Sequence, residues 1–251
     1  MQFTKPIQVW LHKALDEDGE AGYHAWVFPY LGFATWAETE PHVLEKIPQK
    51  LLDYLQFRHQ HDLPPQDVSS PSGQAQVEVV ERVTGNEILF SPDYQAATPR
   101  IVDETIALLH ATRTELLEAV SELADEVLDW DPPYRRFPSW ARWRTIRQIL
   151  AHVANTETHY YLSSIGIQTD IPPASENAPW QAHLSRHREV TMEALRILKT
   201  SHDLARIRFY DDGAWSVRKA LRRLVWHERL HTKSIRRIIK AYWAQRDKFT
   251  A

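Results

Sequence analysis

Four long amphipathic segments constrain the fold of this chain more than any other feature. From Ser91 onward, hydrophobic residues recur three and four positions apart, and loops that contain proline or glycine separate the segments. The segments span residues 100–127, 144–165, 180–199 and 215–245. Helices of roughly 20 to 30 residues, each with one hydrophobic stripe, are typical of a four-helix bundle. We therefore expect residues 93–251 to form an all-α four-helix bundle.

The first 92 residues show a different pattern. Residues 7–12 and 23–28 alternate hydrophobic and polar side chains around an acidic turn, which predicts a β-hairpin. Thr39 stands as a helix N-cap before a periodic hydrophobic run, and residues 77–80 and 87–90 are predicted as two further short strands. Residues 1–92 are thus interpreted as an α+β domain with a small antiparallel sheet and one helix.

The composition excludes several classes of protein. The chain has 251 residues, a formal charge of −3 and no cysteine, so it has neither a disulfide framework nor a cysteine nucleophile. No secretory signal pattern and no run of eighteen hydrophobic residues is present. A cytoplasmic location is expected, without membrane association. The net charge gives no general attraction to nucleic acid, which we do not expect as a partner.

Histidine is abundant, with thirteen in the chain. His227 and His231 are four residues apart in the last segment, so they share one helix face, and the hydrophobic stripe places that face toward the core. His152, three residues after Ile149, is predicted to point inward from the second bundle segment. Three neutral imidazoles from two helices would form a metal site with open coordination positions. Such ligands suit zinc, nickel or iron.

Other histidines compete with this set. His183 and His187 have the same spacing in the third segment, where a solvated pair is the favoured interpretation. His159 could line the same cavity as His152 without binding metal. A lone inward histidine is also more often a hydrogen-bonded core residue than a ligand.

The sequence His227-Glu228-Arg229-Leu230-His231 also satisfies H-E-x-x-H, the metalloprotease helix motif with glutamate as general base. No histidine or glutamate follows it to serve as the third ligand of such enzymes. The protease interpretation therefore fails unless the third ligand lies upstream. Glu228 is then either the catalytic base of another reaction or simply a helix residue among arginines.

Charge is distributed unevenly over the bundle segments. The last segment is strongly basic and the first is strongly acidic. Complementary charge between neighbouring helices, or a solvated face, is favoured over a nucleic-acid surface. No glycine-rich phosphate loop and no G-x-S-x-G turn is present.

Residues 143–154, together with Glu157, Tyr161 and the run from Trp226 to His231, resemble the DinB/YfiT-like superfamily of metalloenzymes. The resemblance covers residues 99–242. It implies one divalent metal ion bound inside the bundle by His152, His227 and His231. It also implies a thiol-dependent transferase or isomerase, or a hydrolase, acting on small molecules. The thiol would come from a low-molecular-weight cosubstrate, and pairing into a homodimer is implied as well.

The N-terminal part has its own resemblance. Residues 9–11, 22–27 and 29–35, with a helix after Thr39, look like the HicB-type antitoxin fold. The DNA-binding helix module that usually follows that sheet is replaced by the bundle. This resemblance implies a protein-interaction or dimerisation module, or a lid on the metal cavity. It supports an alternative function, a non-catalytic scaffold stabilised by metal.

Overall fold

A computed structural model describes residues 6–15, 22–64, 75–133, 141–176 and 178–250. The helices are α1 (Glu40–Gln60), α2 (Pro99–Val120), α3 (Asp125–Leu128), α4 (Ile146–Asn155), α5 (Trp180–Thr200) and α6 (Val217–Thr250). The strands are β1 (Ile7–Ala14), β2 (Tyr23–Trp26), β3 (Ala34–Ala37), β4 (Val77–Gly85), β5 (Ile207–Tyr210) and β6 (Gly213–Ser216).

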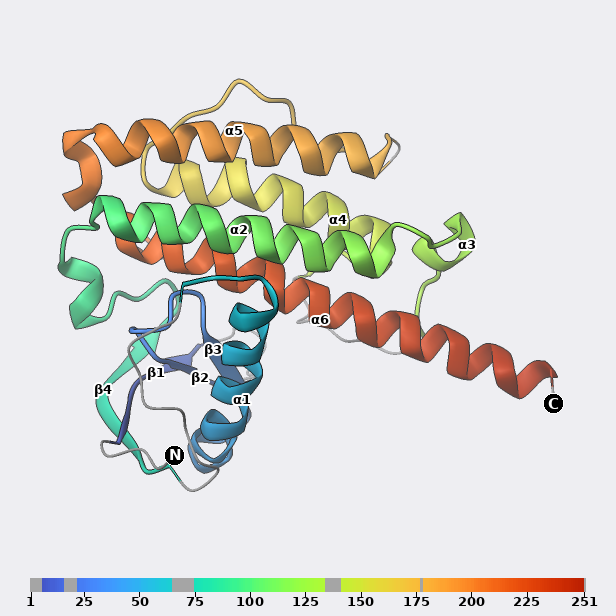
Figure 1. Cartoon of the computed structure of the whole chain (residues 1–251), viewed down its shortest axis with the longest axis horizontal. Helices are drawn as coiled ribbons and strands as arrows, with labels where there is room; N and C mark the ends of the chain where they lie inside the picture. Colours follow the sequence, from blue (N-terminus) through green and yellow to red (C-terminus); the bar gives the residue numbers. More distant parts are fainter. Residues whose placement is uncertain (1–5, 16–21, 65–74, 134–140, 177, 251) are drawn as a thin grey trace.

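The predicted four-helix part is formed by α2, α4, α5 and α6 (Figure 1). The first segment is shorter than expected, since α2 ends at Val120 and the short α3 follows it. The second segment changes its winding: α4 continues directly into a π-helical stretch, Thr156–Leu162. Wider helical turns of this kind occur often at functional sites.

The N-terminal sheet has the strand order β3-β2-β1-β4. The predicted hairpin of β1 and β2 is present and antiparallel, but the expectation of a wholly antiparallel sheet is wrong because β4 runs parallel to β1. The reason is the connection: α1 lies between the hairpin and β4 and returns the chain to the same end of the sheet. The third strand, β3, was not predicted.

Two further differences concern short strands. Residues 87–90 do not form the predicted strand, and Glu87 makes only an isolated bridge to Gly213. The second hairpin, β5 with β6, lies inside the part expected to be all-α. Its signal was the dipeptide Asp212-Gly213, which is typical of tight hairpin turns. Gly213 also allows close approach, because a Cβ there would lie 2.2 Å from the Glu87 carbonyl oxygen.

The sheet and α1 lie directly against the bundle (Figure 1). One hydrophobic core runs from β1 and α1 into α2 and α6, and a second fills the far end of the bundle. The loop between β2 and β3 approaches α6 closely at Gly32, whose φ is +76° and whose absent Cβ would lie 2.3 Å from Val225 Cγ1. Glycine is therefore required at this contact.

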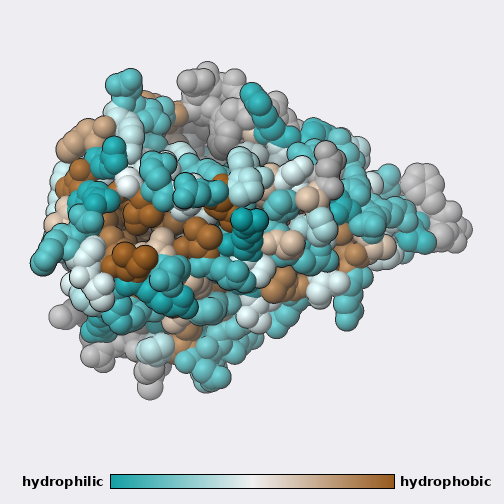
Figure 2. All heavy atoms as spheres, turned by 90° about the horizontal axis from the view of Figure 1, so that it is seen from above, coloured by the Kyte–Doolittle hydropathy of each residue, from teal (hydrophilic) through white to brown (hydrophobic). Residues whose placement is uncertain are grey.

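The upper face of the bundle is mostly hydrophilic, with hydrophobic side chains gathered toward one end (Figure 2). Within the described ranges, no helix is both long enough and apolar enough to cross a membrane.

Candidate metal centre

Three histidines from two helices meet inside the bundle. One ring nitrogen from each of His152, His227 and His231 can be chosen so that all three lie within 4.8 Å of one another. The Nε2 atoms of His152 and His227 are 3.0 Å apart. We call these residues the three-histidine cluster. Among the residues that the structure describes, it is the only group of three or more side chains with this arrangement of potential metal ligands.

The position of His152 follows from the start of α4. Thr145 caps the helix by accepting a hydrogen bond from the Gln148 backbone N–H, and the Gln148 side chain accepts one from the Thr145 N–H. This capping box fixes the first turn. The Trp143 ring stacks on the imidazole of His152, with 3.5 Å between ring centroids and 16° between planes. Together these contacts hold the His152 ring.

Thr156, where the π-helical stretch begins, also contacts His152. Its hydroxyl donates to the His152 carbonyl oxygen at 2.7 Å and lies 3.3 Å from His152 Nδ1. A partner on the nitrogen that does not bind metal orients a histidine ligand. Tyr161, on the same stretch, packs against His227 with 5.5 Å between ring centroids.

All three imidazoles are neutral at physiological pH. Burial lowers the pKa of His152 to about 4. Burial, and then the neighbouring histidines, lower the pKa of His227 and His231 well below the usual value. Neutral imidazole is the form that binds metal. Each histidine of the cluster thus offers one unprotonated ring nitrogen that can bind a metal ion without first losing a proton.

The donor set fits a divalent transition metal. Nitrogen ligands about 2.0–2.1 Å from one zinc ion lie roughly 3 to 4 Å from each other, which is compatible with the separation between His152 and His227. The cluster contains no carboxylate and no thiolate. Imidazole-only sets suit zinc, nickel or iron better than magnesium or calcium, which prefer oxygen ligands.

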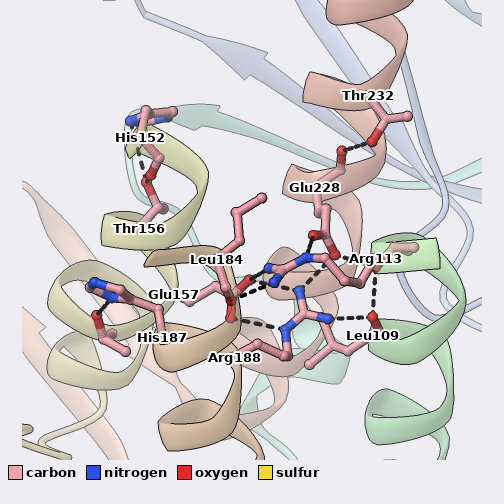
Figure 3. A network of polar contacts seen from close by, with 12 residues as sticks. Leu109, Arg113, His152, Thr156, Glu157, Leu184, His187, Arg188, Glu228 and Thr232 are labelled. Atoms are coloured by element: carbon pink, nitrogen blue, oxygen red, sulfur yellow. Dashed lines mark hydrogen bonds and ion pairs between the residues drawn. The ribbon is translucent and has the colours of Figure 1, made fainter. Parts of the chain in front are cut away.

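A second polar cluster joins the bundle helices (Figure 3). We call it the Arg–Glu network; it consists of Arg113 on α2, Glu157 on the π-helical stretch, Arg188 on α5 and Glu228 on α6. The four ion-pair distances are 2.6 to 2.7 Å. The remaining guanidinium donors reach the backbone oxygens of Leu184 and Leu109. All four charges are therefore compensated in the interior.

The network determines the surroundings of Glu228. One carboxylate oxygen accepts from Arg113 Nε at 2.6 Å, and the other accepts from Arg188 Nη2 at 2.6 Å and from the Thr112 hydroxyl. Burial alone would raise the pKa of Glu228, but the two guanidiniums outweigh it and hold the pKa at about 2. Figure 3 shows this carboxylate directed at Arg113, away from His152. The geometry favours a structural role over that of a catalytic base.

The competing histidines lie elsewhere. The expectation of a solvated pair is wrong for His187, which is fully buried and whose Nδ1 lies 2.8 Å from the Thr158 hydroxyl. The reason is that α5 turns this face toward the π-helical stretch. His183 is half-buried and accepts from the Ser175 backbone N–H. His159 is exposed and packs against His187, so it does not line the three-histidine cluster as expected.

The basic residues of α6 are largely engaged within the molecule. Arg222 forms a bidentate pair with buried Asp93, Lys219 pairs with Glu87 at 2.8 Å, and Arg236 pairs with Glu115 of α2 at 3.5 Å. Complementary charge thus accounts for part of the basic pattern, although most of the partners lie before α2 rather than on it.

Sequence reasoning missed two kinds of residue around the site. The sequence pattern gives Trp143 no role beyond its place at the start of the stretch 143–154, although its ring stacks on the imidazole of His152. Arg188 gave no signal, because lone arginines in amphipathic helices are usually solvated. The only hint for Arg113 was that it stands among the acidic residues of the first bundle segment.

Comparison with known protein families identifies the family of the helical part. Residues 108–235, just over half of the chain, match the DinB superfamily, and the chain belongs to this superfamily. The matched region contains all three histidines of the cluster. Among solved structures, YfiT from Bacillus subtilis aligns with 62% of this chain and 93% of its own length, at 22% identity and a TM-score of 0.45. It is described as a probable metal-dependent hydrolase with an unusual four-helix bundle topology. No curated protein sequence matches the chain.

Proposed function

We propose that this protein is a metal-dependent enzyme of the DinB superfamily that acts on small molecules. One divalent cation, zinc, nickel or iron, would be held by His152, His227 and His231. The observation that carries the proposal is the convergence of three neutral imidazoles in the bundle interior. Three protein ligands leave coordination positions for water or substrate, as catalytic metal sites require.

The surrounding residues prepare the ligands. Trp143 and Thr156 hold the His152 ring, and Tyr161 packs on His227. The Arg–Glu network fixes the rotation of α6 through Glu228, which lies between the two ligands of that helix. Ligands held in this way lose little conformational freedom when the ion binds.

When bound, the ion would supply Lewis acidity and lower the pKa of a coordinated water or thiol. The chain has no cysteine, so any reacting thiol is a cosubstrate. We propose thiol-dependent transfer or isomerisation as the reaction class, with hydrolysis as the outcome when water replaces the thiol. We propose that the protein acts in the cytoplasm and that it is a homodimer.

Metal analysis of the purified protein tests the site. The wild-type chain should retain about one divalent ion, and the double variant His227→Ala/His231→Ala should retain none. His159→Ala is the matched control, because it removes an exposed histidine of the same bundle. If the double variant retains a stoichiometric ion, His227 and His231 are not the metal ligands.

A non-catalytic scaffold is the second candidate. In it, residues 1–92 form a HicB-like interaction domain and residues 93–251 a metal-stabilised bundle. The observation that favours it is the N-terminal sheet, whose edge strands β3 and β4 carry half-exposed Trp36 and Val80. Water relaxation of the Mn²⁺-loaded protein separates the two functions: an enzyme shows a rapidly exchanging water on the ion, and a scaffold shows none.

A further inference from the structure

A cavity separate from the three-histidine cluster lies where the N-terminal part meets the bundle. Its volume is about 530 Å³, within the range of about 300–1,000 Å³ that is typical of small-molecule sites. The loop between β2 and β3 forms one wall, and the first turn of α2 and the first turns of α6 form the others. No histidine lines it.

The walls of the cavity are mainly hydrophobic. The loop contributes Phe28, Leu31 and Phe33, with Trp26 at its start, and α2 contributes Ile101. A ligand that fills this space would gain from burying a hydrophobic or aromatic body.

The charges around the cavity are positive in sum. Arg100, Arg218 and Arg222 line it, against the single carboxylate of Glu104. Glu104 is compensated by Arg58 of α1, whose Nη1 lies 2.8 Å from Glu104 Oε1. The lining therefore carries cationic charge that its own acidic residue does not neutralise.

Arg222 is a fixed donor in the lining. Its Nε and Nη2 atoms donate to the two carboxylate oxygens of Asp93, at 3.0 and 2.6 Å. Its guanidinium lies 4.3 Å from the ring centroid of Trp26 and 5.3 Å from that of Phe28. The Nη1 atom forms no hydrogen bond with any residue that the structure describes. A guanidinium held in this way keeps one N–H₂ group for a ligand.

Arg100 and Arg218 supply the uncompensated charge. Neither forms an ion pair with a carboxylate in the described part of the chain, and Arg218 donates only to the neutral side chain of Gln95, at 2.8 Å. Arg100 lies in the first turn of α2, where the helix dipole also favours negative charge. Two cationic side chains beside hydrophobic walls fit an anion with a hydrophobic body.

We propose that this cavity binds a small carboxylate with an aromatic or acyl body, at a site distinct from the metal centre. The carboxylate lies among Arg100, Arg218 and Nη1 of Arg222, and the hydrophobic body packs against Phe28, Phe33 and Ile101. Because the walls come from both the N-terminal part and the bundle, the ligand stabilises the contact between them.

Calorimetric titration of the full-length, metal-loaded protein tests the site, with 2-naphthoate as the probe and 2-naphthamide as its neutral isostere. We expect 2-naphthoate to bind at least about tenfold more tightly, since charge-assisted hydrogen bonds to arginine are the stronger kind. Arg100→Gln and Arg218→Gln should each weaken 2-naphthoate by about tenfold and leave 2-naphthamide unchanged. Arg196→Gln, which removes an exposed arginine of α5, should change neither.

Two further arms locate the probe. The double variant His227→Ala/His231→Ala should bind 2-naphthoate as the wild type does, and inorganic phosphate should not displace it. Loss of binding in the histidine variant would assign the probe to the metal centre and overturn the proposal. Equal affinity for 2-naphthamide would show that the carboxylate is not recognised and would overturn that part of the proposal. Displacement by inorganic phosphate would show that the hydrophobic body contributes nothing and would overturn the other part.

Discussion

The three-histidine cluster and the Arg–Glu network are neighbours on α6, where Glu228 lies between His227 and His231. The network compensates two carboxylates with two guanidiniums, and backbone oxygens complete the guanidinium donors. The histidine cluster brings together three neutral nitrogens that prefer a cation. The first region has its charges compensated within the chain, whereas the second brings together ligand atoms that we propose bind an ion.

This difference shows how one helix serves two purposes. Successive residues of an α-helix are rotated by about 100°, so adjacent positions face different neighbours. His227 faces α4 and the π-helical stretch, while Glu228 faces α2 and α5. The network therefore sets the rotation at which the histidines meet.

The largest expected effect comes from breaking the network. Glu228→Ala leaves two buried guanidiniums without this carboxylate, and we expect a loss of about 3–5 kcal/mol in the free energy of unfolding. Urea denaturation of the metal-free protein measures it, with exposed Glu118→Ala of α2 as the control. A loss below about 1 kcal/mol, typical of a surface charge, would show that the network does not support the fold.

Metal removal should have the next largest effect. An ion present at 100 times its dissociation constant stabilises the folded state by about 2.7 kcal/mol. Chelation of the wild-type protein should lower the free energy of unfolding by that amount, and the double variant His227→Ala/His231→Ala should show no change. Equal sensitivity of the variant to the chelator would place the ion elsewhere.

Thr156→Val tests the support of a single ligand. It removes the hydroxyl beside His152 Nδ1, and we expect metal affinity to fall about tenfold. Competition with a chromophoric chelator measures the affinity. Thr114→Val is the matched control, because Thr114 also donates to the carbonyl four residues earlier but contacts no ligand. Similar losses in both variants would assign the effect to the helix backbone.

The smallest effect concerns His24, a half-buried histidine outside both clusters. Burial lowers the pKa of His24 to about 3, so below pH 6.5 the unfolded chain binds a proton that the folded chain does not. Stability should therefore fall as the pH falls. Between pH 7 and pH 6 the loss from one such group is roughly 0.7 kcal/mol. His24→Gln should remove this part of the pH dependence, while exposed His42→Gln should not. If the free energy of unfolding has the same slope against pH in the wild type and in His24→Gln, the prediction is wrong.

Much of the fold could be predicted from periodicity. Helical spacing indicated the four bundle segments and α1, because each buries a continuous hydrophobic stripe. The periodicity does not specify the parallel pairing of β4 with β1 or the hairpin of β5 and β6. Strand direction depends on the connection, and four-residue strands carry too little periodicity.

The candidate site shows the same division. The spacing of His227 and His231 and the inward face of His152 selected three residues that the structure brings together. The stacking of Trp143 and the pairing of Arg188 with two glutamates were not accessible, because they depend on residues distant in sequence. The cavity at the N-terminal junction gave no sequence signal, since its walls come from three separate segments.

The sequence by itself determined the helical segments, the absence of thiol chemistry within the chain and the three histidines that share inward faces. These properties are local, because they depend on residue type and on spacing within one element. Only the tertiary structure decided which arginines are buried, where Glu228 is directed and how the N-terminal sheet joins the bundle. Those properties depend on the relative rotation and contact of elements, which the pattern along one segment does not specify.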